Sequence, residues 1–207
     1  VKSIYYLFYV GWTQAKTVPF IASIGLAVTK NLNRKFKRYS NAPIMGRTKD
    51  DPIFTASCFV QKNKNSYKMF YTSNLSWGKI KNNTVPKYTV KEASSSDLIN
   101  WKHESVTFKH KKGEIAITRP WICENNSRDV MLYSYRSDFY KIGVAEKINN
   151  KWIRKDKSIK ILKKEKPSDL KSQEYCSIIN YKNQKYMFYN GDNYGEHGIG
   201  LSILKNN

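Results

Sequence analysis

The sequence YMFYNG at residues 186–191 contains a short apolar and aromatic core that occurs four times along the chain. The four copies read LFY at 7–9, MFY at 69–71, MLY at 131–133 and MFY at 187–189. Their tyrosines are 62, 62 and 56 positions apart. A recurrence at a nearly fixed period indicates that one structural unit is repeated along the chain.

Further strand-like segments flank the cores in the same order each time. An earlier segment precedes three of the cores, and a second apolar segment follows all four. A polar turn and a short segment with Phe36, Trp101 or Trp152 come next in three units. Four short strands separated by polar turns are typical of one antiparallel propeller blade. The preceding segments are residues 56–60, 118–122 and 174–178, and the following ones are 24–28, 88–93, 142–145 and 199–202.

The repeat predicts an all-β fold, a β-propeller of four-stranded antiparallel blades that forms one domain over residues 1–207. A single blade cannot bury both of its faces, so blades pack around a shared axis. A β-sandwich with coincidental repeats is the alternative. The first unit lacks an inner strand and the last ends after its third strand, so we expect an incomplete propeller that continues at the N-terminus, or a fragment. The expected units are a partial blade at 1–48, blades at 49–110 and 111–166, and a partial blade at 167–207.

The formal charge is +21, with 37 Lys and Arg against 16 Asp and Glu. Such an excess attracts anionic partners, such as nucleic acid, an acidic polysaccharide or a phosphorylated sugar. A coding bias towards Lys and Asn is the alternative, and the scatter of the lysines through turns favours it. The main basic run is Lys163, Lys164 and Lys166, and such a run is usually a solvated loop. Nucleic acid is therefore not the expected partner.

Metal, cofactor and membrane binding are not expected. The three cysteines, Cys58, Cys123 and Cys176, show no CxxC spacing, and the three histidines share no ligand spacing with them. The longest apolar runs are about five residues, whereas a membrane span needs about 20. No secretory leader is visible, so a cytoplasmic location is expected.

Several short motifs resemble the five-bladed propeller superfamily of arabinanases, levansucrases and invertases, which comprises glycoside hydrolase families 32, 43, 62 and 68. They are LFYVGW at 7–12, IGLAV at 24–28, Asp51-Pro52, Arg119-Pro120-Trp121, and YMFYNGDNYGEHGIG at 186–200. The resemblance extends along essentially all 207 residues, and it is closest to an uncharacterised bacterial branch. It implies an enzyme that hydrolyses a furanoside or another glycan. It also implies that about one and a half N-terminal blades, which supply the catalytic Asp in such enzymes, are missing here.

The blade geometry predicts where a site would form. The start of each inner strand and the end of each second strand lie on the same face of a propeller. Carboxylates, Arg and aromatic side chains gather at these positions, and they suit a sugar, because rings stack on sugars and charged groups bind hydroxyls in bidentate fashion. The first set is Asp50, Asp51, Glu114, Arg119 and Glu174, and the second is Trp12, Trp77, Tyr135, Arg136, Asp192, Asn193, Tyr194 and His197.

Glu174 is the candidate general acid. It lies thirteen residues before the Met of its core, where the equivalent residues of other units are Ala56 and Thr118. A Glu among such small counterparts is unusual. In the resembled family the acid is a Glu at this kind of position, often followed closely by Pro, whereas Cys176 stands where that Pro is expected. The alternative is a Glu that accepts loop N–H groups at the start of a strand.

Asp51 is the candidate auxiliary carboxylate. The motif Asp50-Asp51-Pro52 resembles the Arg-Asp-Pro element that stabilises the transition state in invertase-like enzymes, with Asp50 in place of the Arg. A turn before Pro52 is the alternative. Arg119 would bind a substrate carboxylate, phosphate or hydroxyl pair, or else it forms a salt bridge between blades.

The other candidates are assigned to substrate binding. Solvation in a basic loop is the alternative for Glu114, a tight loop for Asp192 and Asn193, and packing under a loop for the tryptophans. These candidates are Trp12, Trp77, Glu114, Arg136, Asp192 and Asn193. The predicted function is a glycoside hydrolase-like propeller, for which two carboxylates must flank the scissile bond. A non-catalytic carbohydrate-binding propeller is the alternative, and self-association through open blade edges is a further expectation.

Overall fold

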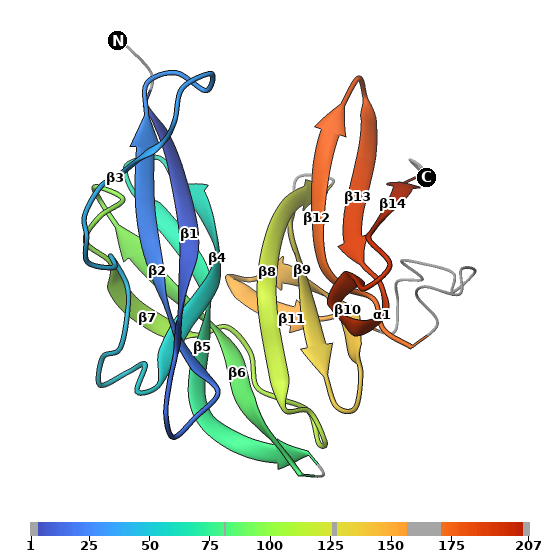
Figure 1. The fold of residues 1–207 in the computed structure, drawn as a ribbon. Coiled ribbons are helices and arrows are strands. Elements are labelled where there is room, and N and C mark those ends of the chain that lie inside the picture. Colours follow the sequence, from blue (N-terminus) through green and yellow to red (C-terminus); the bar gives the residue numbers. More distant parts are fainter. Residues whose placement is uncertain (1–3, 81, 126–127, 157–170, 205–207) are drawn as a thin grey trace. The chain divides into compact units, whose positions relative to one another are not determined.

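The computed structural model describes residues 4–80, 82–125, 128–156 and 171–204. Within these residues the regular secondary structure is β-strand, with one short helical turn, α1 (Asp192–Gly195), as the exception. The chain divides into two compact units, Val1–Thr107 and Phe108–Asn207 (Figure 1). The expected blade boundary at residue 166 and the run from Lys163 to Lys166 lie outside the described residues.

The first unit contains two antiparallel meanders. Strands β1, β2 and β3 pair in that order, and strands β4 to β7 pair in chain order in a second meander. The strands are β1 (Tyr5–Gln14), β2 (Phe20–Thr29), β3 (Lys37–Arg38), β4 (Phe54–Lys62), β5 (Tyr67–Ile80), β6 (Asn83–Ser95) and β7 (Lys102–Val106).

The second unit also contains two antiparallel meanders. Strands β8 to β11 pair in chain order, and β13 lies between β12 and β14. The strands are β8 (Ala116–Asn125), β9 (Arg128–Arg136), β10 (Tyr140–Ile148), β11 (Lys151–Arg154), β12 (Glu174–Tyr181), β13 (Gln184–Asn190) and β14 (Ile199–Leu204).

A tyrosine opposite a glycine is the repeated contact within the meanders. Tyr133 on β9 is paired with Gly143 on β10, and a Cβ atom at Gly143 would lie 2.5 Å from the Tyr133 ring. The same pairing joins Tyr9 to Gly25 and Tyr189 to Gly200. The absent side chain gives the ring a place on the neighbouring strand, which explains why Ile-Gly recurs after each of these cores. In the β4–β7 meander Lys91 stands opposite Tyr71 instead.

A β-bulge near the start of each inner strand is the second repeated feature. The register shifts after Ala56 in β4, after Thr118 in β8 and after Glu174 in β12. The next residue is left-handed in all three strands, with φ values of 31° at Ser57, 52° at Arg119 and 56° at Tyr175. Bulges bend a strand and redirect the side chains beside them. The equivalent positions read from the sequence are therefore equivalent in the backbone.

Apolar side chains join the two meanders of each unit. In the second unit the core includes Leu132, Val144, Cys176 and Met187, which come from both meanders. In the first unit Ile24 packs with residues of the second meander, including Met69 and Tyr71. Burial of these side chains holds the meanders face to face, at roughly 1.5–3 kcal/mol for each large residue.

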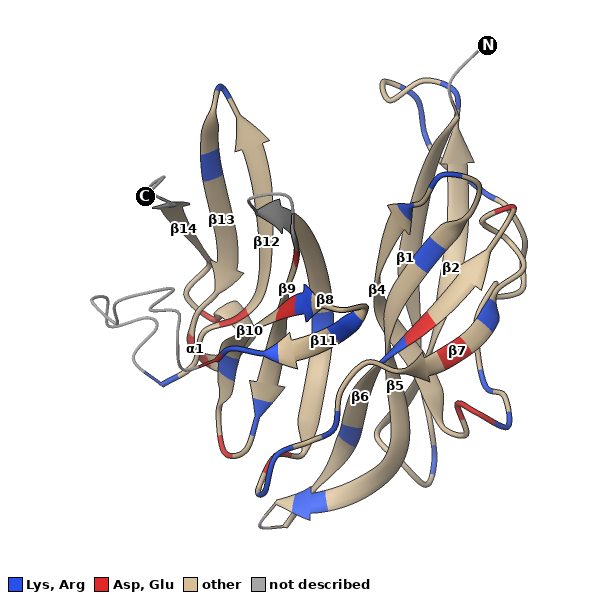
Figure 2. Ribbon diagram, turned by 180° about the vertical axis from the view of Figure 1, so that it is seen from behind, with Lys and Arg blue, Asp and Glu red and all other residues tan. Residues whose placement is uncertain are grey.

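Charged residues lie on strands and loops of both units. Figure 2 shows Lys and Arg distributed over many elements, with Asp and Glu among them. The lysines do not line a single element, as the scatter in the sequence predicts.

Candidate functional site

Glu174 is the first residue of β12, and only 1% of its surface is exposed. Burial raises the pKa of its carboxyl group to about 7, and the charge of Asp192 acts in the same direction. The backbone N–H of Tyr194, the Ser172 hydroxyl and the charge of Arg136 oppose that rise. The ionised form is therefore held by two hydrogen bonds, but burial outweighs them, and the group titrates near neutrality.

Arg136 and three tyrosines surround this carboxyl group. Arg136 ends β9, and its guanidinium carbon lies 4.8 Å from the centre of the Tyr140 ring. Its Nη1 donates a 3.3 Å hydrogen bond to the Tyr194 hydroxyl. The ring of Tyr175 packs against Tyr140 at 5.4 Å and stacks on Tyr194 at 6.2 Å. We call Glu174, Arg136, Tyr140, Tyr175 and Tyr194 the Glu174 site.

The loop after β13 brings Tyr194 to this site. Asn193 and Tyr194 are left-handed, with φ values of 52° and 61°, and the Asn190 amide donates a 3.0 Å hydrogen bond to the carbonyl of Tyr194. Asp192 accepts the backbone N–H groups of Lys171 and Ser172 at 2.8 and 2.6 Å. The Asp192 carboxylate therefore ties the loop to the segment before β12.

Asn193, which the sequence assigns to substrate binding, is exposed and donates a 2.6 Å hydrogen bond to Glu196 within the same loop. The contacts of Asp192 and Asn193 are those of a tight loop. Asp192 also acts on Glu174 through its charge.

Asp51 lies in the first unit and is fully buried. Its carboxylate accepts a hydrogen bond from the Tyr71 hydroxyl at 3.1 Å, and it lies 3.2 Å from the Lys91 ammonium and 3.1 Å from Nδ1 of His103. Lys91 also donates to the carbonyl of Asp50. These contacts join the segment before β4 to strands β5, β6 and β7, so Asp51 has a structural role in the first unit.

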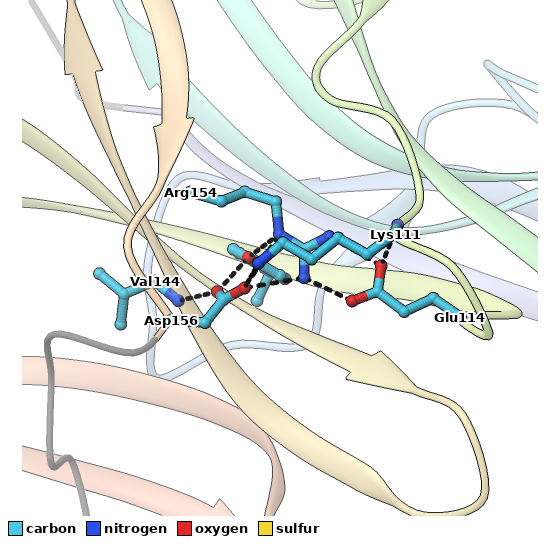
Figure 3. A network of polar contacts seen from close by, with 6 residues as sticks. Lys111, Glu114, Val144, Arg154 and Asp156 are labelled. Carbon is cyan, nitrogen blue, oxygen red and sulfur yellow. Dashed lines mark hydrogen bonds and ion pairs between the residues drawn. The ribbon is translucent and has the colours of Figure 1, made fainter.

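Glu114 belongs to a buried ionic network in the second unit (Figure 3). Both of its oxygens lie 2.7 Å from the Arg154 guanidinium, and one accepts the Lys111 N–H at 2.8 Å. Arg154 also pairs with Asp156, which accepts hydrogen bonds from the Tyr133 hydroxyl and the Val144 N–H. The alternative of a solvated Glu114 is wrong, because its side chain is only 7% exposed, and its assignment to substrate binding stays a prediction.

The Arg154 guanidinium and the Lys111 N–H hold the pKa of Glu114 below its usual range against the effect of burial. The sequence analysis did not select Arg154 and Asp156 as candidate residues. They lie at and just after the end of β11, a segment that contains no copy of the core motif.

The other predicted residues occupy different surroundings. Trp12 is 61% exposed and packs on Phe20 at 4.4 Å, and Trp77 packs on the same ring at 5.5 Å. Both tryptophans belong to an aromatic cluster of the first unit. Arg119 is exposed at the β8 bulge. Among the sequence candidates, the second unit thus brings Glu174, Arg136 and Asp192 together, with Tyr194 from the wider set.

Tyr140 and Tyr175 are site residues that the sequence reasoning did not select. Tyr175 aligns with Arg119 and Ser57 in the repeat. Because Arg119 was selected at that position, the alignment could also have identified Tyr175 as a site residue. Tyr140 opens β10 and has no repeated counterpart in the motifs. In the described ranges no group of three or more His, Cys, Asp or Glu is placed to hold a metal ion. No helix in those ranges has the length and apolar character of a membrane span.

No protein-family model matches the chain. An uncharacterized protein of Mycobacterium tuberculosis (strain H37Rv) is 29% identical over 205 residues, which are 97% of this chain and 67% of that protein. A solved glycoside hydrolase superposes with a TM-score of 0.76 at 18% identity, over 100% of this chain and 64% of that one. For an α-L-arabinofuranosidase from Lactobacillus brevis the TM-score is 0.73 at 10% identity, over 100% and 70%.

These likenesses concern the fold. The chain spans about two thirds of the length of the proteins that it matches. The expected all-β propeller architecture is confirmed, and so is the expected likeness to propeller glycoside hydrolases. The chain has the β-propeller fold of glycoside hydrolases.

Proposed function

We propose that this chain carries a glycoside hydrolase site, with Glu174 as the general acid. The supporting observation is a buried carboxyl group at the start of an inner strand whose pKa is raised to about 7 by burial. A general acid works best when its pKa lies near the working pH, since it must be protonated before it can donate.

In this proposal Glu174 donates its proton to the glycosidic oxygen as the bond to the leaving group breaks. The exposed ring of Tyr194 and the partly exposed ring of Tyr175 offer apolar surface to a sugar, and Arg136 offers hydrogen-bond donors. Hydrolysis also needs a second carboxylate about 5–10 Å away, on the other side of the scissile bond.

The test compares the chain with its Glu174→Gln variant on aryl α-L-arabinofuranosides and β-D-fructofuranosides. Replacement of the acid is expected to lower kcat on 4-nitrophenyl glycosides by about 10²–10⁴-fold. The loss is expected to shrink on 2,4-dinitrophenyl glycosides, because that leaving group needs no proton. The matched control is Glu146→Gln, a half-buried glutamate on β10 with no role in the site.

Equal activity of the Glu174→Gln variant and the parent chain would reject Glu174 as the acid. The second candidate function is a carbohydrate-binding propeller without catalysis. It is favoured by the full engagement of Asp51 with Tyr71, Lys91 and His103. Calorimetric binding of an arabino-oligosaccharide that is never cleaved would support this second function.

A further inference from the structure

Arg136 is a cation without a carboxylate partner among the described residues. Its direct contacts are the Tyr140 ring and the Tyr194 hydroxyl, and its charge acts on Glu174 without a direct ion pair. Arg154 in the same unit differs, since it pairs with Glu114 in a bidentate fashion and also with Asp156. An arginine is normally placed where its planar fork can meet a carboxylate or phosphate. The pairing capacity of Arg136 is therefore unused among the residues that the structure describes.

The hydrogen-bonding capacity of Arg136 is also incomplete. Its Nε atom is buried and has no hydrogen-bond partner in the described part of the chain. Buried donors without partners are rare in folded proteins, and a bound ion or ligand is one of the usual reasons for them. Nη1 already donates to the Tyr194 hydroxyl. The donor that still lacks an acceptor is therefore the N–H at Nε.

The charge of the Glu174 site also favours an anion. The acid must be protonated before it can act, and this step rests on the proposed function. With Glu174 neutral, the carboxylate on which the charge of Arg136 acts no longer balances that charge. A substrate that carries a negative charge would restore the balance and bring a bidentate acceptor to the guanidinium.

We propose that the Glu174 site binds a glycan whose sugar ring carries an anionic oxygen group, held by the guanidinium of Arg136. The carboxylate of a uronic acid and the phosphate of a phosphorylated sugar share this chemistry. Tyr175 and Tyr194 pack against the sugar ring, and Arg136, which is held on the buried Tyr140 ring, is the residue that determines specificity for the acidic group.

Three sugars that differ only at C6 test the proposal by calorimetry with the full chain at low ionic strength. They are galactose, galacturonate and galactose 6-phosphate. The dissociation constant of one or both acidic sugars is expected to be about tenfold lower than that of galactose. The better of the two acidic sugars identifies which anionic group the site takes.

The Arg136→Met variant is expected to bind all three sugars equally. The Arg136→Lys variant should keep part of the preference, because it keeps the charge but loses the fork. Tyr194→Phe keeps the stacked ring but removes the hydroxyl that accepts from Nη1 and helps to hold the guanidinium in place. If Arg136→Met does not fold, this variant should show a smaller loss of the preference for acidic sugars. The control Lys141→Met removes one exposed charge from β10 and should leave the preference intact, which excludes attraction by the net charge alone.

Equal affinity for galactose and both acidic sugars, or no binding of any of them, overturns the inference. A preference that survives in Arg136→Met overturns it as well. Glu174-dependent hydrolysis of neutral furanosides without any acidic preference contradicts the inference and leaves the proposed function standing. An acidic preference without hydrolysis contradicts the hydrolase function and leaves a binding site for acidic glycans.

Discussion

Buried carboxylates in the second unit have opposite protonation behaviour because their partners differ. Glu114 and Asp156 share the Arg154 guanidinium, and their pKa values are lowered in spite of burial. Glu174 has only two hydrogen bonds and a more distant arginine, so burial raises its pKa. A direct bidentate pair offsets the desolvation of a carboxylate, whereas a nearby charge does not.

This difference predicts how Glu174 affects stability across pH. A raised pKa in the folded state means that folding favours the protonated form. The free energy of unfolding should therefore fall as pH rises from about 4.5 to about 7, by roughly 3 kcal/mol from this group. Glu174→Gln should remove that slope and stabilise the chain at pH 8 relative to the parent.

Urea unfolding of both proteins across this pH range measures the difference between them. The control is Glu146→Gln, which leaves Glu174 in place and should therefore keep the pH dependence that Glu174 causes. A constant difference for Glu174→Gln would mean that Glu174 has an ordinary pKa, and it would weaken its assignment as an acid.

The meanders depend on the close contact between a core tyrosine and the strand beside it. Tyr133 is fully buried, and its hydroxyl is hydrogen-bonded to Asp156 and Arg154. The ring is therefore held at both ends, by the glycine opposite it and by the ionic network. In this respect the repeated sequence element and the network of Figure 3 form one packed structure.

Gly143→Ala tests this contact. A new Cβ at 2.5 Å from a ring that cannot move should destabilise the chain by about 1–3 kcal/mol. Gly11→Ala is the matched control, since its nearest neighbour would be 4.0 Å away. Thermal unfolding of the two variants measures the effect. Equal midpoints would show that Tyr133 moves freely aside.

One face of the β12–β14 meander is apolar and is not covered by any of the residues that the structure describes. Met187 and Tyr189 point into the core of the unit, so the alternate residues Tyr186 and Phe188 lie on the opposite face. Tyr186 pairs with Ile179 and Ile203, and Phe188 pairs with Leu201. Ile179, Leu201 and Ile203 are 47%, 51% and 58% exposed. A contiguous apolar face of this kind is typical of an interaction surface.

Self-association through this face is therefore expected for the chain as it stands. Light scattering after gel filtration should give a mass above 24.2 kDa that falls on dilution. Leu201→Lys places a charge on this face, on the strand beside Phe188, and should give a monomer. Phe139→Lys, at an exposed apolar residue outside that sheet, should not. A parent chain that is monomeric at every concentration would contradict this expectation.

The sequence alone determined the repeat, and with it the all-β propeller fold and the equivalent positions along each strand. Strands alternate their side chains with a period of two, so core motifs and glycines at fixed offsets are visible without coordinates. The alignment that set Glu174 apart from Ala56 and Thr118 coincides with the bulges seen in β4, β8 and β12.

The tertiary structure alone decided which charged residues pair. Arg154 pairs with Glu114, which is forty positions away, and Asp51 contacts His103 on β7. The meanders bring turns that are distant in sequence close together, and the spacing of residues in the sequence does not predict which turns these are. It also decided that Glu174 and Tyr194 share a site, through left-handed residues in one loop. Protonation follows from burial and partners, and both are properties of the folded chain.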